Sequence, residues 1–207
     1  MRRLSLCYAI ALSFASAAGL AQEPQPIGLP KPALEGGKTL MQALAERRTS
    51  RVFSDEALSP QMLSNLLWAA FGVNRERMER GGVGRTAPSA MNRQEVQLYV
   101  LLASGAYRYD ARAGVLAPVA PGDLRALAGP PAAAKAAVTI VYVADADAGY
   151  AAVDTGFIGQ NVYLFSAAFG LNAWFRASGV AGLAAPLRLS ERQRVLYTQT
   201  VGYPPGK

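Results

Sequence analysis

The 207-residue chain is short of the side chains that enzymes use for acid–base or nucleophilic chemistry. It contains no histidine, its one cysteine is Cys7, and its 14 acidic residues are dispersed. This composition excludes a Ser-His-Asp triad and zinc sites built from histidine and cysteine. It also excludes a cysteine nucleophile in the mature protein if Cys7 belongs to a cleaved signal peptide. We therefore expect a bound cofactor to carry the chemistry.

Cationic and amide side chains gather in two short segments that could bind such a cofactor. The first is Arg47-Arg48-Thr49-Ser50-Arg51, which places three guanidinium groups and two hydroxyls within five residues. Planar guanidinium groups bind phosphate oxygens two at a time and stay protonated. Taken alone, this segment is better explained as the solvated end of a helix, where cations complement the helix dipole.

The second segment is the turn from Pro88 to Gln94. Pro88 fixes the turn, Ser89 can offer its backbone or its hydroxyl, and Asn92 and Gln94 supply amides that both donate and accept hydrogen bonds. An Asx-type turn leading into a strand explains the same residues equally well.

The hydrophobic pattern predicts one domain that must position these two segments. Thr39 and Ser59 are expected helix N-caps, and Pro60 suits the first position of the second helix, which should end near Gly72. The loop 74–86 carries six charges and three glycines, which is typical of loops that move or bind something. The strands expected after it are 96–102, 106–109, 115–119, 137–143, 173–177 and 195–201, together with a short helix capped by Asp123 and a helical turn capped by Ser190.

A long helix is expected over Asp154–Gly170, and it is apolar nearly all round. Such a helix must be buried on several sides, which favours packing against a second copy of the chain. Gln160 and Asn161 would then be buried amides that need partners in a cofactor, in the dimer interface or in a neighbouring turn. The expected apolar stripe consists of Val153, Phe157, Asn161, Leu164, Phe165 and Ala168.

Residues 1–21 have the features of a cleavable signal peptide, with Arg2 and Arg3 before an apolar core. The paired arginines fit either the Sec or the twin-arginine route, and both lead to the periplasm. Cleavage leaves a net charge of +5 on scattered residues, which argues against nucleic-acid binding. Residues 22–37 are rich in proline and glycine and predict an extended leader, so the domain is expected to span residues 38–207.

Three stretches together resemble the nitroreductase superfamily, and in particular its SagB/ThcOx-type branch. They are residues 47–53, 85–94 and 159–171, with further agreement in 64–72, 107–110 and 201–204. The resemblance covers nearly all of residues 38–203. It implies an α+β fold with a central mixed or antiparallel sheet flanked by helices. It also implies a homodimer formed through long helices, with two FMN sites at the interface.

The resemblance also implies roles for the arginine segment. Arg47 and Thr49 would bind the FMN phosphate, and Arg48 would bind the phosphate or the ribityl chain. Arg51 would lie beside the ribityl chain and the N1–C2 edge of the ring, where a cation raises the reduction potential of the flavin.

The remaining cofactor contacts come from other segments. Phe175 lies where relatives present backbone amides to flavin N5, and Lys207 would help to close the phosphate site. No catalytic side chain and no metal are expected. The residues that would close over the FMN of the partner subunit are Pro88, Ser89, Asn92 and Gln94.

Members of this superfamily typically run a ping-pong reaction, in which reduced flavin N5 passes two electrons to a nitroaromatic, a quinone or a similar small molecule. An azoline-type peptide dehydrogenase is a narrower alternative, but those relatives use a Lys-Tyr pair, and no lysine after residue 21 precedes a tyrosine. A non-catalytic flavin-binding protein is the third alternative. Because nicotinamide cofactors are scarce outside the inner membrane, a membrane redox partner is a candidate donor.

Overall fold

The computed structural model describes residues 24–79 and 81–206, so the predicted signal peptide, Arg80 and Lys207 lie outside the described residues. A seven-stranded sheet forms the centre, in the order β1-β6-β5-β4-β7-β9-β8. Every neighbouring pair is antiparallel, so the sheet is antiparallel rather than mixed. Its strands are β1 (Ile27–Gly28), β4 (Gln97–Leu102), β5 (Gly105–Asp110), β6 (Val115–Pro121), β7 (Val138–Asp145), β8 (Asn172–Arg176) and β9 (Gln193–Gly202).

The sheet separates two hydrophobic cores, because successive strand residues point to opposite faces. On β4, Leu98 and Val100 belong to one core, whereas Tyr99 and Leu101 belong to the other. The central strand β7 is buried on both faces, which explains why its sequence is almost entirely apolar or β-branched.

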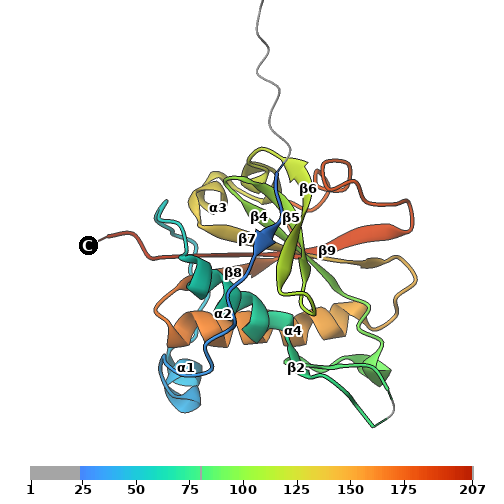
Figure 1. Cartoon of the computed structure of the whole chain (residues 1–207). Coiled ribbons are helices and arrows are strands. Elements are labelled where there is room, and N and C mark those ends of the chain that lie inside the picture. The colour runs from blue at the N-terminus through green and yellow to red at the C-terminus, as the bar shows by residue number, and fades with distance from the viewer. Residues whose placement is uncertain (1–23, 80, 207) are drawn as a thin grey trace, which may run out of the picture.

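Helices α2 (Pro60–Phe71) and α4 (Ala151–Ala168) cover the face of the sheet that carries the larger core, and α1 (Leu40–Glu46) packs against α4 (Figure 1). The other face is covered by η2 (Arg125–Ala128), α3 (Pro131–Lys135) and the segment 177–192. The predicted caps are confirmed, since Thr39 and Ser59 each accept a bond from the backbone N–H three residues later, at 3.4 and 3.2 Å.

Helix α4 begins three residues before the predicted start at Asp154 and ends two residues before Gly170. Its buried side faces the sheet through residues such as Ile158 and Val162, so Gln160 lies on the exposed side. In the single chain Gln160 is exposed and Asn161 is half-buried, so the burial of Gln160 against a cofactor or in a dimer interface stays a prediction. The predicted stripe lies partly on the surface of the single chain.

The predicted leader is extended, but it is bonded to the domain. Residues 24–38 form a strap that runs from β6 across α2 to the end of α4. Strand β1 in this strap pairs with β6, Ala33 N donates to Asn65 Oδ1 (2.8 Å) and Lys38 N donates to Ala168 O (3.0 Å). The strap thereby fixes the position at which α1 begins.

The loop 74–86 is more ordered than its sequence indicates, because β2 (Val73–Arg75) and β3 (Gly84–Arg85) pair as a two-stranded ribbon. The helical turn expected at Ser190 is only a hydrogen-bonded turn, in which Ser190 O accepts from Gln193 N (2.9 Å). Asp123 does accept from Arg125 N (3.0 Å), at the start of η2. Among the described residues, no helix combines the length and the apolar character needed to cross a membrane.

Candidate cofactor site

The arginine segment lies along the outer edge of β8. Ser50 N donates to Ala173 O (3.0 Å), Ser54 N donates to Tyr203 O (2.9 Å), and Asn172 Nδ2 donates to Val52 O (2.7 Å). An edge strand has unpaired backbone groups, so a segment laid beside it is held by the sheet itself. These bonds therefore fix the direction in which the arginine segment runs after the end of α1.

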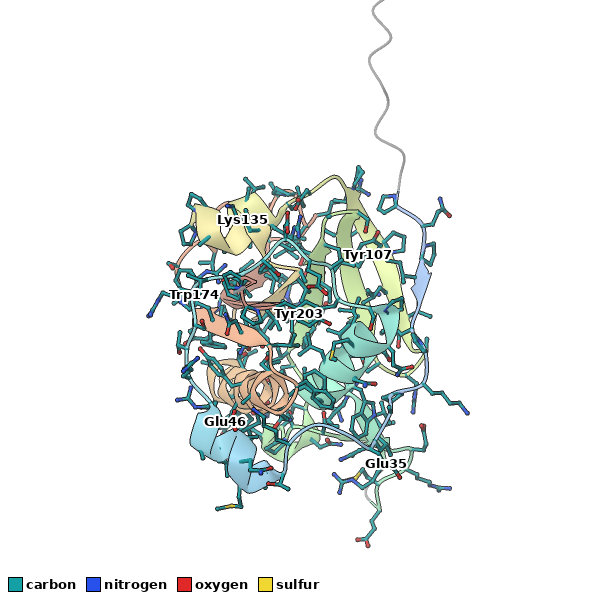
Figure 2. The ribbon with its side chains drawn as sticks, turned by 90° about the vertical axis from the view of Figure 1, so that its left-hand side faces the viewer. Glu35, Glu46, Tyr107, Lys135, Trp174 and Tyr203 are labelled. Carbon is teal, nitrogen blue, oxygen red and sulfur yellow. The ribbon has the colours of Figure 1, made fainter. Side chains whose placement is uncertain are left out.

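A cleft of about 530 Å³ opens beside this segment, between the ends of α1 and α4 and the start of β8. This volume is within the usual range of small-molecule sites. Figure 2 shows Glu46 on α1 and Trp174 on β8 on the same side of the molecule. The cleft is lined by Lys38, Ala45, Glu46, Arg47, Arg48, Tyr163, Ser166, Ala167, Gly170, Leu171, Asn172 and Pro204.

Tyr163 on α4 is the centre of the hydrogen bonding here. Its hydroxyl accepts from Phe175 N at 2.9 Å and lies 2.9 Å from Thr49 Oγ1. The guanidinium of Arg47 lies over the Tyr163 ring, 5.3 Å from its centroid. A hydroxyl has one proton to donate, so Tyr163 can donate to Thr49 while it accepts from β8. Tyr163 thus orders both Arg47 and Thr49.

Positive charge dominates the cleft. Within residues 24–79 and 81–206, none of Arg47, Arg48 and Arg51 forms an ion pair, while Lys38 pairs with Glu46. Arg51 lies over the ring of Trp174, 5.4 Å from its centroid. Three guanidinium groups without carboxylate partners favour a bound anion, and a phosphate dianion fits them well.

Like the three arginines, Ser166 lacks a polar partner for its side chain in the described residues. The residue lines the cleft, and its hydroxyl is fully buried and makes no hydrogen bond within the described residues. Unsatisfied buried hydroxyls are rare and call for an explanation such as a bound ligand or water. The polar character of this cleft therefore fits a ligand that carries hydroxyls and phosphate.

A buried cation lies on the other side of Trp174. Arg176 is 6% exposed, and its guanidinium lies 4.8 Å from the centroid of the Trp174 ring. It donates to Thr200 Oγ1 (2.8 Å) and to Ala128 O (2.6 Å), and it bonds to no carboxylate among the described residues. Burial lowers the pKa of Arg176 to about 10. Neutral oxygens therefore hold this charge in place.

Phe175, by contrast, points its ring into the core. The ring packs against Tyr197 and Tyr142, with centroid distances of 4.9 and 5.7 Å. A Cβ at Gly159 would come within 2.8 Å of this ring, so only glycine allows α4 to approach β8 so closely. The Phe175 amide, which the sequence assigned to flavin N5, is bonded to Tyr163. Its role toward FMN stays a prediction, as does that of Lys207, which lies outside the described residues.

The second predicted segment is tightly bonded within itself. Ser89 Oγ accepts from Gln94 N (2.7 Å), while the Gln94 amide accepts from Arg85 Nε (2.7 Å) and donates to Val83 O (2.7 Å). Asn92 Nδ2 also donates to Val83 O (3.2 Å), and Pro88 is exposed. Gln94 thus uses both atoms of its amide inside the loop, and its contact with FMN stays a prediction.

This loop also stores backbone strain. Met91, Asn92 and Gln94 have φ of 51°, 54° and 53°, a region that residues other than glycine rarely adopt. The loop is anchored by Asp154 Oδ1, which accepts from Ala90 N at 3.1 Å. Strain of this kind persists where the surroundings fix it, and it is common at ligand sites.

The structure does not bring the two predicted segments together within one chain. The arginine segment contacts α4 at Tyr163, whereas the second segment contacts α4 at Asp154, nine residues earlier. At 1.5 Å per residue these points are about 14 Å apart along the helix. Figure 1 shows α1 and the β2 ribbon at opposite ends of α4. Within one chain, the two segments therefore lie near opposite ends of α4.

Sequence reasoning missed Tyr163, Ser166 and Arg176. No local pattern distinguishes Tyr163 and Ser166 from core residues of an apolar helix, and Arg176 reads as an ordinary exposed strand residue. Their roles depend on the approach of α4 to β8, which no short motif encodes.

A model of the nitroreductase family matches residues 44–203. The structure of a candidate nitroreductase from Ralstonia eutropha JMP134 is similar, with 32% sequence identity, a TM-score of 0.79, and coverage of 91% of this chain and 93% of that one. No curated protein matches the chain.

Two more distant structures share the fold. One is a candidate nitroreductase from Anabaena variabilis, with a TM-score of 0.72 at 18% identity. The match includes 87% of this chain but only 42% of the Anabaena chain. The other, from Desulfovibrio desulfuricans, was solved in complex with FMN. It has a TM-score of 0.57 at 23% identity, over 82% of this chain and 88% of that one.

Proposed function

Since the chain belongs to the nitroreductase family, we propose that it is an FMN-dependent oxidoreductase that passes electrons to a small-molecule acceptor. The observation that carries the proposal is the cleft beside Arg47, Arg48 and Arg51, whose guanidinium groups have no carboxylate partners in the described residues. This charge suits the phosphate of a flavin mononucleotide, and the complex of the Desulfovibrio desulfuricans relative with FMN supports that choice.

The chain's own residues would bind and orient the cofactor. Arg47 and Thr49, ordered by Tyr163, would hold the phosphate, with Arg48 at the open side of the cleft. Arg51 stands beside Trp174, where its charge would favour an electron-rich ring. When bound, FMN supplies two-electron transfer, in a ping-pong sequence between a donor and a nitroaromatic or quinone acceptor.

We further propose that the active form is a homodimer. Each chain leaves large apolar side chains in solvent on α1 and α4, including Met41 at 74% exposure and Val153 at 58%. Exposed apolar surface of this kind marks an interaction face. A second copy packed there would also supply the missing loop, since the two cofactor segments lie at opposite ends of α4 within one chain.

Export to the periplasm completes the proposal, because residues 1–21 have the composition of a signal peptide. A membrane redox partner would then be the electron donor. The SagB/ThcOx-type features of the sequence leave the acceptor open among nitroaromatics, quinones and similar molecules.

The test is to purify the mature protein, to identify its flavin by mass spectrometry, and to reduce it anaerobically with dithionite. Mixing with a quinone should reoxidise the flavin with one quinone consumed per flavin. A protein that purifies without flavin and does not bind added FMN would contradict the proposed function. Flavin that is bound but not reoxidised by any acceptor would favour the non-catalytic alternative.

A further inference from the structure

A large cleft of about 890 Å³ lies between the β2–β3 ribbon and the strained loop 86–94. It is separate from the arginine cleft, because the two have no lining residue in common. Its lining comes from residues that the proposed function has not used so far, apart from Asn92. They are Arg75, Arg77, Met78, Glu79, Gly81, Gly82, Met91 and Asn92.

The ribbon and the loop hold each other in place. Asn92 Nδ2 and Gln94 Nε2 both donate to Val83 O, at 3.2 and 2.7 Å. Met91 is 68% exposed, and its left-handed backbone (φ 51°) holds its side chain out over the cleft. The same bonds that strain the loop therefore shape one wall of the cleft.

Arg75 is positioned by its cross-strand neighbour, Gly84. A Cβ at Gly84 would lie 2.4 Å from Arg75 Nε and 2.8 Å from its Nη2, so the guanidinium lies flat against the glycine backbone. Its Nε also lies 3.3 Å from Asn74 Oδ1, to which it donates. An exposed arginine held in this way loses little conformational freedom when it binds an anion.

The described lining holds two cations, Arg75 and Arg77, against one carboxylate, that of Glu79, so a net positive charge remains. Neither Arg75 nor Arg77 forms an ion pair in the part of the chain that the structure describes. Met78 and Met91 add two polarisable thioethers, which make favourable contacts with aromatic rings and adapt to rings of different shape. The described lining thus combines a net positive charge with polarisable thioethers.

We propose that this cleft binds the acid group and part of the ring of an aromatic electron acceptor, so that the enzyme prefers anionic acceptors to neutral ones. The inference rests on the proposed function, which places loop 86–94 of one copy over the cofactor of the other. Arg75 and Arg77 bind the carboxylate, and the methionines contact the ring.

The test compares 4-nitrobenzoate with its neutral methyl ester, using protein whose flavin has been reduced with dithionite. In each turnover, two electrons and two protons pass from reduced FMN to the nitro group, which becomes a nitroso group and releases one water. The ratio of kcat/KM for the acid to that for the ester should fall roughly tenfold in Arg75→Gln/Arg77→Gln, since two exposed charge contacts are lost. Gly84→Ala, which displaces Arg75 without removing its charge, should lower the same ratio.

The control is Arg108→Gln/Arg112→Gln, which removes the same charge from exposed positions on the β5–β6 hairpin. An equal fall of the ratio in the control, or no fall in the test variant, would overturn the inference. Calorimetric binding of 4-nitrobenzoate to the unreduced protein separates the two claims. If no acceptor is reduced but the test variant loses affinity, the anion site stands and the proposed function fails.

Discussion

The hydroxyl of Tyr163 lies 2.9 Å from Thr49 Oγ1, although 114 residues separate the two in the sequence. The bond joins the middle of α4 to the segment that follows α1. Because the same hydroxyl accepts from Phe175 N on β8, it ties three elements together at the arginine cleft. Cofactor binding should therefore depend on a residue that carries no charge.

Tyr163→Phe tests this dependence. The variant keeps the ring under Arg47 but removes both hydrogen bonds, each worth about 1 kcal/mol. We expect the dissociation constant of FMN to rise roughly tenfold, as measured by fluorescence titration of the apoprotein. Tyr150→Phe, at the other end of α4, should leave the constant unchanged, and an unchanged constant in Tyr163→Phe would remove Tyr163 from the site.

Arg47→Ala and Arg51→Ala should each lower the flavin content of the purified protein. Each removes a charge that has no carboxylate partner in the described residues and is free to bind the cofactor. Affinity should fall roughly tenfold or more. The measurement is the ratio of flavin to protein absorbance, with Arg108→Ala as the control. Full occupancy in both variants would contradict the site assignment.

Phe157→Glu should convert the dimer to a monomer. Phe157 is 45% exposed on α4, and a buried carboxylate in an apolar interface is costly. Sedimentation at micromolar concentration checks the oligomeric state, and the monomer should also lose FMN because it lacks the second loop. Leu127→Glu is a matched control, since Leu127 is also 45% exposed but lies on η2, away from the proposed interface. A wild-type protein that is monomeric would refute the proposed dimer.

Alkaline pH should destabilise the fold through its buried phenols. Burial raises the pKa of Tyr109 to about 12 from an ordinary value of 10. The unfolded chain therefore loses this proton first, and the stability that the neutral phenol contributes is lost as the pH rises from 10 to 12. Tyr109→Phe should reduce the loss by about 1 kcal/mol at pH 11, measured by urea unfolding. An equal loss in the variant would show that Tyr109 titrates normally.

Export offers a fifth prediction, which concerns residues outside those that the structure describes. Arg2→Lys with Arg3→Lys keeps the positive charge that the Sec route needs but removes the twin-arginine pair. We expect folded, flavin-loaded precursor to accumulate in the cytoplasm, because the proposed flavin site, built from two chains, would favour folding before export. Cell fractionation measures the outcome. Normal export of the variant would show that the Sec route suffices.

The secondary structure was predictable wherever short-range chemistry decides it. Ser59 and Pro60 mark the start of α2, and the run of apolar and β-branched residues in β7 marks a strand covered on both faces. The β2–β3 ribbon was not predictable, because its charged residues have no alternating pattern. The ribbon is ordered by two hydrogen bonds to Val83 O, which the side chains of Asn92 and Gln94 donate from a loop farther along the chain.

The site was predictable only in part. The resemblance, rather than the segment alone, assigned Arg47 and Arg51 to the cofactor, and the structure leaves both without a carboxylate partner in the described residues. The side of α4 that faces the sheet was not predictable, because an apolar helix gives no signal of it; that side is set by the packing of Gly159 against Phe175. Long-range packing of this kind cannot be read from helical periodicity.

The covering of both edges of the sheet has a consequence for aggregation. On one side, β1 is only two residues long and is flanked by Pro26 and Pro30, which cannot donate to another strand. At the other edge, Ala173 O on β8 already accepts a hydrogen bond from Ser50 N. Neither edge offers a long row of free backbone groups, so a crowded compartment gives the folded chain little opportunity to add strands from its neighbours.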